Sequence, residues 1–507
     1  MSRLLKIGSR RSALAKLQSY HVAARLRELY PDLKIEFVFK ESMGDKDLVT
    51  PLWQMGDRGV FTKDFVADLL EERVDVVIHS WKDLDLKDTE GTEVLSVLPR
   101  ADQRDLFLFK KSALLSVDYD TIRIFSSSPR REYNLVRFFQ KALPASLPRN
   151  ISFEPVRGNI STRMKKWLDS DLQGMIVAKA ALDRLLAEDF PESTDEEYSR
   201  IRQEIREALR LSVFMCLPLS ENPNAPAQGA LAAEVKTGRE DILKIIRSIA
   251  SPGVAETVMA ERNILKKYGG GCHQKIGVAC IKRDYGTATW LRGLADSGEV
   301  LNEFTFVSGS QHPKAKSSEN IWPLTKTAVR FERREIAADY PATDIWVSRS
   351  NAWKSEWSQQ DYAKVVWASG LKTMYDLAAK NVWVHGSSES LGEKEDPGVD
   401  LLLGRSPQFT KITHNNSENI DSAINRLCTY ELGVAGDIPD LTGKTHFFWM
   451  SGHQFDLVFA KNPAIADGYH SCGPGITRDH LRKRLGDSAK IDVYLKFEDW
   501  LDYNERT

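Results

Sequence analysis

Three segments in the first half of the chain repeat one pattern: a short strand, a turn of serine and arginine, and the start of a helix. They span residues 4–17, 121–131 and 151–163. Each places hydroxyl groups, free backbone N–H groups and arginine side chains at a helix N-terminus, where the helix dipole favours anions. In open α/β sheets, ligands gather at the carboxyl ends of the strands. The pattern therefore predicts an α/β fold that binds a polyanion with several carboxylates.

The arginines of these turns are the first candidate ligand-binding residues. They belong to the clusters 9–12, 126–131 and 157–163. Arginine offers a planar fork of N–H donors that suits carboxylates. A single Arg-Arg pair is more often a solvated helix face, so the binding interpretation depends on the threefold repetition.

A fourth predicted strand, 74–78, leads to a carboxylate instead of a cation, because Asp83 follows it closely. Surrounding cations favour the ionised form of such a group. An ionised Asp83 could stabilise a cationic intermediate or accept a hydrogen bond from a ring N–H. The alternative is a capping aspartate that pairs with Lys82.

Cys272 follows three glycines in the loop between a predicted helix and a predicted strand. The helix begins at Ser251 and Pro252 and ends at Gly269, and the strand covers 276–281. Such a loop gives Cys272 freedom to carry an attached group and let it move. The alternative is a small buried thiol beside a helix stop.

Composition excludes several classes of protein. A length of 507 residues suggests three or four domains, and a net charge of −1 gives no basic field for nucleic acid. Five cysteines without a CxxC pair argue against a disulfide framework, and the ten histidines show no metal-ligand spacing. With no visible secretory signal or membrane span, we expect a cytoplasmic protein without a metal.

Eight motifs in the same order make residues 3 to about 300 resemble the porphobilinogen deaminase (hydroxymethylbilane synthase) family. The motifs are 7–15, 44–45, 56–63, 79–83, 126–131, 157–163, 225–231 and 270–277. Proline is usual in the family where Asp85 and Lys275 stand, an acidic residue where Gly269 stands, and leucine where Pro129 stands. None of these departures removes a group assigned a role below.

The resemblance implies a transferase of porphyrin and heme biosynthesis that condenses four porphobilinogen molecules into a linear tetrapyrrole with release of ammonia. It implies a dipyrromethane cofactor attached to Cys272 through a thioether, with Asp83 as the catalytic aspartate. The catalytic group also includes Lys82 and Arg10, and the cofactor contacts are Lys82, Asp83, Ser128, Arg130 and Arg131. The substrate contacts are Arg10, Ser12, Arg58, Phe61, Arg157 and Arg163. At the position of Arg58 the family more usually has lysine.

The fold implied by the resemblance has two lobes of periplasmic-binding-protein type and a small α+β domain that presents Cys272. The first lobe covers 1–98 and 225–247, the second 103–222, and the cofactor-carrying domain 250–307. Within the second lobe, 187–216 is predicted to be a helical surface insertion. We expect a monomer whose partner is the small-molecule substrate, with no nucleic acid or membrane. The alternative is a two-lobed anion-binding protein without catalysis.

The remaining third of the chain follows a linker predicted at 308–325. Residues 326–507 contain two copies of strand, helix, strand, glycine turn and helix, which predict a two-lobed α/β unit. The segment 470–477 resembles the uroporphyrinogen III synthase family. That resemblance implies a second activity on the linear tetrapyrrole; the alternative is a non-catalytic interaction domain.

Overall fold

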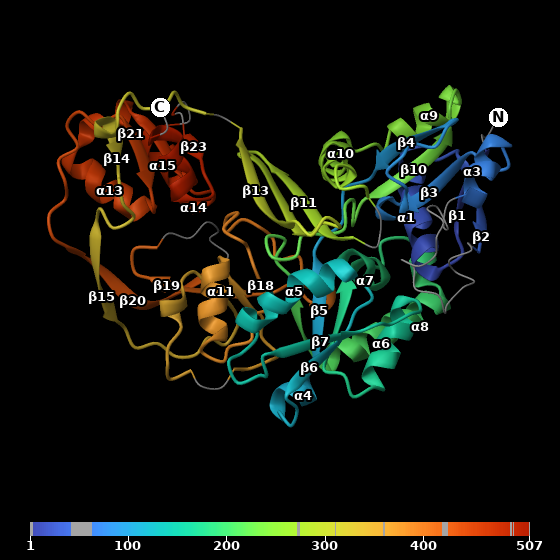
Figure 1. The fold of residues 1–507 in the computed structure, drawn as a ribbon, viewed down its shortest axis with the longest axis horizontal. Coiled ribbons are helices and arrows are strands. Elements are labelled where there is room, and N and C mark those ends of the chain that lie inside the picture. The colour runs from blue at the N-terminus through green and yellow to red at the C-terminus, as the bar shows by residue number, and fades with distance from the viewer. Residues whose placement is uncertain are drawn as a thin grey trace.

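The computed structural model describes most of the chain as a mixed α/β protein, which confirms the predicted class. Five sheets lie side by side in an open arc, with the N-terminal sheet at one end and the C-terminal sheet at the other (Figure 1). Within the described part, no helix combines the length and apolar character that crossing a membrane requires. The described residues are 4–41, 63–270, 274–309, 311–357, 360–417, 424–486, 489 and 491–505.

The first sheet has the order β2-β1-β3-β10-β4. β1 is parallel to β2 and β3, whereas β10 returns from later in the chain and is antiparallel to β3 and β4. The carboxyl ends of β1 and β3 therefore lie next to each other. The strands are β1 (Leu4–Arg10), β2 (Lys34–Lys40), β3 (Val76–Ser80), β4 (Thr92–Val97) and β10 (Leu231–Lys236), and the helices are α1 (Ala13–Leu29), α3 (Lys63–Leu70) and α9 (Glu240–Arg247).

The second sheet has the order β7-β6-β8-β5-β9. Two stretches of chain, 98–104 and 217–230, connect it to the first sheet; we call them the first and second crossing segments. The strands are β5 (Asp105–Lys110), β6 (Thr121–Phe125), β7 (Asn150–Glu154), β8 (Gly174–Ala178) and β9 (Ser212–Cys216). The helices are α4 (Lys111–Leu115), α5 (Pro129–Ala142), α6 (Ile160–Leu168), α7 (Lys179–Leu186) and α8 (Glu196–Arg210).

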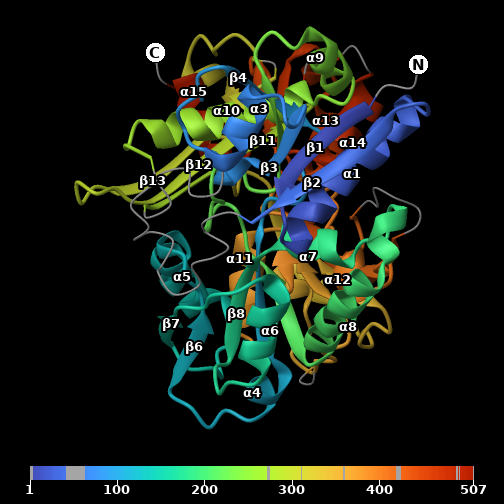
Figure 2. The same cartoon turned by 90° about the vertical axis from the view of Figure 1, so that its right-hand side faces the viewer.

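The prediction of a helical surface insertion over 187–216 is wrong at its end. Residues 212–216 are entirely buried and form β9, which pairs with β5. The apolar run Val213–Cys216 favours a buried strand at this position. α8 itself is not only a solvated helix, because Tyr198, Ile205 and Ala208 are buried. It lies beside α12 (Asp400–Leu403), where Arg206 donates to the backbone oxygen of Leu401 at 2.6 Å (Figure 2).

A third, antiparallel sheet follows, made of β11, β12 and β13, with helix α10 packed against β11. α10 begins at Pro252 as predicted, although the Ser251 hydroxyl makes no capping bond. Gly269 has φ +86°, a left-handed conformation that ends this region as the sequence indicates. The elements are α10 (Pro252–Lys266), β11 (Lys275–Arg283), β12 (Gly286–Leu294) and β13 (Val300–Ser308).

The C-terminal third contains two further sheets. One is parallel, with the order β14-β21-β22-β23, and the other has the order β15-β20-β19-β16-β17-β18. Their strands are β14 (Ile321–Trp322), β21 (His446–Trp449), β22 (Tyr469–Cys472) and β23 (Ile491–Val493), then β15 (Arg330–Glu335), β16 (Asp344–Val347), β17 (Val366–Ala368), β18 (Gly386–Ser387), β19 (Phe409–His414) and β20 (Asn425–Ala435). The longer helices are α11 (Leu371–Ala378), α13 (Gly452–Lys461), α14 (Ile476–Leu485) and α15 (Phe497–Glu505).

The segment predicted as a linker, 308–325, is packed into the C-terminal part. His312 is buried, and its backbone N–H donates to Asp492 Oδ2 at 2.5 Å. Tyr503 donates its hydroxyl to the backbone oxygen of His312 at 2.9 Å, and β14 pairs with β21. These contacts anchor the described part of the segment to the C-terminal part, so it is not a free connection there.

The second sheet and the sheet of β16 share one hydrophobic core. Trp383 packs against Phe107 and Phe109 of β5, with ring centroids 6.2 and 5.5 Å apart. The indole N–H of Trp383 donates to the backbone oxygen of Phe214 at 2.8 Å. The backbone N–H of Cys216 donates to the backbone oxygen of His385 at 2.7 Å, so β9 is covered and not an open edge. The sequence carries no signal for this docking.

Candidate active site

Asp83 and Arg10 lie at the carboxyl edge of the first sheet. Asp83 ends a single 3-10 turn directly after β3, and Arg10 is the last residue of the neighbouring parallel strand β1. Arg10 Nη1 is 3.9 Å from Asp83 Oδ2, and about a third of the Asp83 side chain is exposed. A small cavity of about 30 Å³ opens beside them, lined also by Gln18 and Ser80. A long, exposed ion pair is weak, so both groups remain able to engage a ligand.

Lys82 connects this edge to the second sheet through Gln228. Lys82 Nζ donates to Gln228 Oε1 at 3.3 Å, and Gln228 Nε2 donates to Asp105 Oδ1 at 2.9 Å. Burial lowers the pKa of Lys82, and the charge of Asp83 opposes this shift. Lys82 therefore lies between the carboxylate of one sheet and the charged cluster of the other.

Asp105 is the centre of that cluster, and the sequence analysis missed it. It is fully buried at the start of β5 and accepts hydrogen bonds from Arg130 Nη2 at 2.7 Å and Arg131 Nη2 at 2.7 Å. Burial alone would raise its pKa, but Arg131 and Arg130 hold the pKa far below the usual range. A charged residue that opens an otherwise apolar strand was the available signal.

Arg130 and Arg131 come from the first turn of α5, as predicted, but they are placed differently. Arg130 is buried, and its Nη1 donates to Asn222 Oδ1 at 2.9 Å and to the backbone oxygen of Pro223 at 2.7 Å. It thereby ties α5 to the second crossing segment. The Arg131 side chain is 11% exposed and that of Arg130 is 5% exposed, so Arg131 is the more accessible of the two to an anion.

Arg157 and Arg163 add positive charge next to Arg131. Arg163 lies in the first turn of α6, and its Nε donates to the backbone oxygen of Gly158 at 2.6 Å. Burial, Arg131 and Arg157 together lower the pKa of Arg163 to about 10. Several guanidinium groups held this close, beside helix N-termini, form a site suited to a molecule with several carboxylates.

Ser12 and Ser128 stand at the N-cap positions of α1 and α5. Neither side chain makes the usual capping hydrogen bond to its helix. In contrast, Asn159 caps α6 by accepting from the backbone N–H of Thr162 at 2.8 Å. The hydroxyls of Ser12 and Ser128 are thus placed at helix N-termini without being used to cap them, as a ligand-binding role requires.

Three predicted site residues, Cys272, Arg58 and Phe61, lie outside the described residues. The described chain reaches Gly270, whose φ is +67°. A Cβ at that position would lie 2.4 Å from Leu86 Cδ1. The loop that carries Cys272 therefore starts against the segment that follows Asp83.

A second buried carboxylate, Glu261, joins α10 to both crossing segments, and the sequence analysis did not single it out. Arg100 donates to it in a bidentate pair at 2.9 and 2.8 Å. The backbone N–H groups of Ala227 and Cys280 also donate to Glu261, at 2.8 and 2.9 Å. This network fixes the third sheet relative to the first two.

The described site residues supply guanidinium groups, an ammonium group and hydroxyls. Among the described residues, no group of three or more His, Cys, Asp and Glu side chains is arranged to hold a metal ion.

Comparison with known proteins identifies the family. Residues 5–244 match the family model described as porphobilinogen deaminase, dipyrromethane cofactor binding domain. The porphobilinogen deaminase of Syntrophomonas wolfei is 32% identical over 316 residues, which cover 62% of this chain and 92% of the relative. The enzymes of Clostridium novyi and Desulfitobacterium hafniense are 30% and 31% identical, over 59% and 61% of this chain and 90% of each relative. The chain belongs to the porphobilinogen deaminase family.

Proposed function

We propose that the first three sheets act as a porphobilinogen deaminase, which condenses four porphobilinogen molecules into a linear tetrapyrrole and releases ammonia. The observation that carries the proposal is the position of Asp83. Its partly exposed carboxylate lies 3.9 Å from Arg10. It is also joined through Lys82 and Gln228 to the arginine cluster around Asp105. One acidic group beside many cations is what a reaction on a polycarboxylate with a developing positive charge requires.

The described residues fit the dipyrromethane that the family implies. A covalently held dipyrromethane supplies the primer to which substrate pyrroles are added. Its carboxylate side chains match the N–H donors of Arg131, Arg157 and Arg163. These three arginines lie close together, since Arg131 and Arg157 lower the pKa of Arg163. We infer that Ser128 and Lys82 complete this binding surface and that Cys272 is the point of attachment.

Asp83 has two tasks in the proposed reaction. Its carboxylate accepts a hydrogen bond from a pyrrole N–H and so orients the ring. It also stabilises the positive charge that develops on the substrate as ammonia leaves. Arg10 binds a substrate carboxylate beside it, and Ser12 donates its hydroxyl to the same group.

The test is to incubate the full-length protein with porphobilinogen and to follow both consumption of substrate and intact mass. We expect the mass of the resting protein to exceed that of the chain by one dipyrromethane. Further increments of one pyrrole should appear during turnover. A protein that binds porphobilinogen but shows neither the added mass nor ammonia release would be an anion-binding protein without catalysis.

We also propose that the C-terminal part acts on the linear tetrapyrrole as a uroporphyrinogen III synthase. The supporting observation is a basic cluster around His414, at the end of β19. Burial, together with His453, Lys411 and Arg349, lowers the pKa of His414 to about 4. Asn416, in the turn after β19, and His453 of α13, which packs against β21 of the other C-terminal sheet, approach to 3.1 Å here. This arrangement suits a carboxylated ligand held between the two sheets.

The isomer formed from porphobilinogen by this chain alone tests the second activity. Type III uroporphyrinogen supports it, whereas type I alone would make the C-terminal part a non-catalytic interaction domain.

A further inference from the structure

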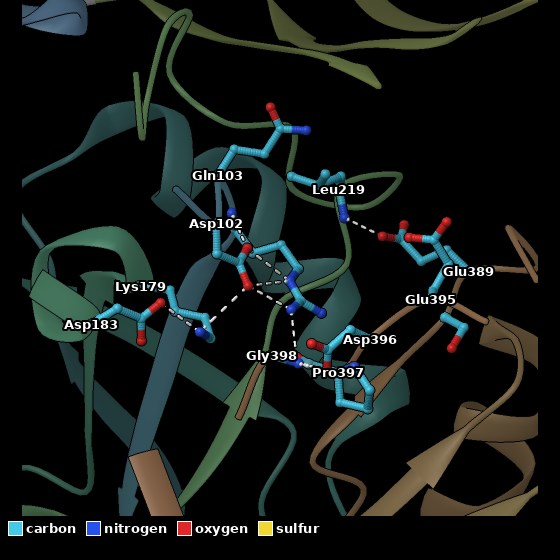
Figure 3. Close-up of polar contacts among 12 residues, drawn as sticks. Asp102, Gln103, Lys179, Asp183, Leu219, Glu389, Glu395, Asp396, Pro397 and Gly398 are labelled. Atoms are coloured by element: carbon cyan, nitrogen blue, oxygen red, sulfur yellow. Dashed lines mark hydrogen bonds and ion pairs between the residues drawn. The ribbon is translucent and has the colours of Figure 1, made fainter. Parts of the chain in front are cut away.

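One segment of the C-terminal part, residues 389–398, reaches the place where the first two sheets are connected. We call it the clasp. It runs from β18 toward α12 and contacts both crossing segments and the third sheet (Figure 3). The proposed functions use none of these residues.

The contact with the second crossing segment is made by Glu389. Its two carboxylate oxygens accept the backbone N–H groups of Leu219 at 2.9 Å and Ser220 at 2.7 Å (Figure 3). Two successive amides that donate to one carboxylate fix the local backbone direction, and hydrogen bonds to charged acceptors are the stronger kind.

The contact with the first crossing segment is made by the backbone of Pro397, which accepts from Arg104 Nη2 at 2.7 Å. The same guanidinium is held by Asp102, with Nε 2.9 Å from Oδ1. Asp102 in turn lies 3.5 Å from Lys179 Nζ, which bonds Asp183 at 2.6 Å (Figure 3). The clasp thus ends on a charged network that continues into the second sheet.

The third sheet is held at the middle of the clasp. Arg283 of β11 makes a bidentate pair with Glu395, with both distances 2.6 Å. Tyr285 donates its hydroxyl to the backbone oxygen of Leu391 at 2.8 Å. Parts of the deaminase that are distant in sequence are therefore bonded to ten consecutive residues of the C-terminal part.

The backbone of the clasp is strained at its point of contact. Glu389 and Ser390 have φ of 51° and 64°, so two successive non-glycine residues are left-handed. Such residues are strained and persist where the surrounding structure holds them. The N–H of Glu389 donates to Ser387 Oγ at 3.0 Å and that of Ser390 to the backbone oxygen of Ser369 at 3.1 Å. This conformation aims the Glu389 carboxylate at the second crossing segment.

A cavity of about 550 Å³ separates the clasp from the first crossing segment and from the third sheet. Its walls include Gln103, Thr257, Ile281 and Ser388. Because this space is not filled by side chains, close packing does not immobilise the first crossing segment on that side. On the side of the cavity, the first crossing segment is restrained by the hydrogen bond between Arg104 and Pro397 of the clasp.

The clasp is also bonded to β19 of one C-terminal sheet and to α14, which packs against β23 of the other. Lys411 of β19 donates to Glu393 at 2.6 Å, and Lys394 pairs with Asp479 of α14 at 2.7 Å. A change in the spacing of these two sheets would therefore pull on the clasp.

We propose that the clasp is a coupling device: it fixes the two crossing segments in one geometry and so makes movement between the first and second sheets depend on the state of the C-terminal part. Movement between these sheets accompanies the rounds of chain growth in the proposed deaminase reaction. The coupling itself does not require that reaction, so it can be tested separately.

The test is hydrogen–deuterium exchange on the full-length protein and on its Glu389→Gln variant. The variant loses the charge that holds the amides of Leu219 and Ser220. The decisive peptide is 98–104, whose backbone amides do not include the two that donate to Glu389, although the charge of Arg104 lies close enough to influence Glu389. We expect its exchange to become about tenfold faster, together with that of 217–220.

Asp344→Asn is the matched control. Asp344 is a buried carboxylate of the same part, and it accepts the backbone N–H groups of Val365 at 2.9 Å and Gln408 at 2.8 Å, remote from the crossing segments. Unchanged exchange of 98–104 in Glu389→Gln would overturn the proposal. Equal acceleration by Asp344→Asn would overturn it too, because the effect would then be general loosening. Absence of deaminase activity from the unaltered protein, together with the expected change in exchange in Glu389→Gln, would count only against the proposed function.

Discussion

Arg131 holds Asp105 in a forked pair, with Nε 3.0 Å from Oδ2 and Nη2 2.7 Å from Oδ1. Arg130 Nη2 also donates to this carboxylate, at 2.7 Å from Oδ2. One fully buried acid thus balances two arginines of α5 and fixes the direction in which Arg131 faces the site. The binding surface is preorganised by a residue that does not itself face the ligand.

Replacement of Asp105 should therefore be costly. Asp105→Asn leaves two buried guanidinium groups without their counter-charge, and we expect a loss of about 3–5 kcal/mol in the free energy of unfolding. Urea unfolding of the full-length protein measures it. Asp171→Asn is the control, because Asp171 pairs with Arg123 on the surface and its removal should change nothing measurable. Equal effects of the two variants would contradict the role given to Asp105.

Asp83→Asn should separate catalysis from folding. We expect turnover of porphobilinogen to fall about 100-fold or more, since the charge aimed at the developing cation is lost. The unfolding midpoint should not change, because the ion pair with Arg10 is long and partly exposed. Initial rates and a thermal melt measure the two effects. Asp85→Asn, two residues on, is the control and should keep normal turnover.

Cys272→Ser should abolish attachment of the cofactor, because a thioether needs the sulfur. Intact-mass measurement of the purified variant should give the mass of the chain alone. Cys428→Ser removes a free, partly buried thiol from the C-terminal part and should retain the added mass. Added mass on the Cys272 variant would place the attachment elsewhere.

Two buried histidines should make the C-terminal part sensitive to acid. Burial lowers the pKa of His470 to about 4 and that of His385 to about 3. In each ring Nδ1 accepts an N–H, from Trp449 Nε1 at 2.9 Å and from the backbone of Val366 at 3.1 Å. The unfolded chain takes up these protons near pH 6.5 and the folded chain does not. Stability is therefore full above pH 6.5 and falls as the pH drops toward 4.

At pH 5 each histidine should lower the free energy of unfolding by about 2 kcal/mol. Urea unfolding at a series of pH values, followed by tryptophan fluorescence, measures the slope. His470→Gln keeps an acceptor for Trp449 but cannot be protonated, so its slope between pH 6.5 and 5 should be shallower. The same slope in both proteins would show that His470 does not contribute.

Local elements were largely predictable from the sequence. The strand at 121–125 and the helix starts at Pro129 and Pro252 agree with the structure, because short-range periodicity and proline determine them. The proximity of Asp83 to Arg10 follows from parallel strands that end at one edge. The partners of Asp105 and Gln228 were not predictable, because they lie more than 20 and 100 residues away in the chain. Such contacts arise from packing between sheets and leave no local pattern.

The core shared by Phe107, Phe109 and Trp383 bears on how this protein can be divided. A chain cut after residue 309 would expose the aromatic face of β5 and leave the backbone of Cys216 without its acceptor, His385. We expect such a fragment to aggregate, whereas shorter relatives exist without any C-terminal part. We therefore expect that the chain cannot be shortened to its relatives' length without redesigning that face, because the C-terminal third keeps it covered.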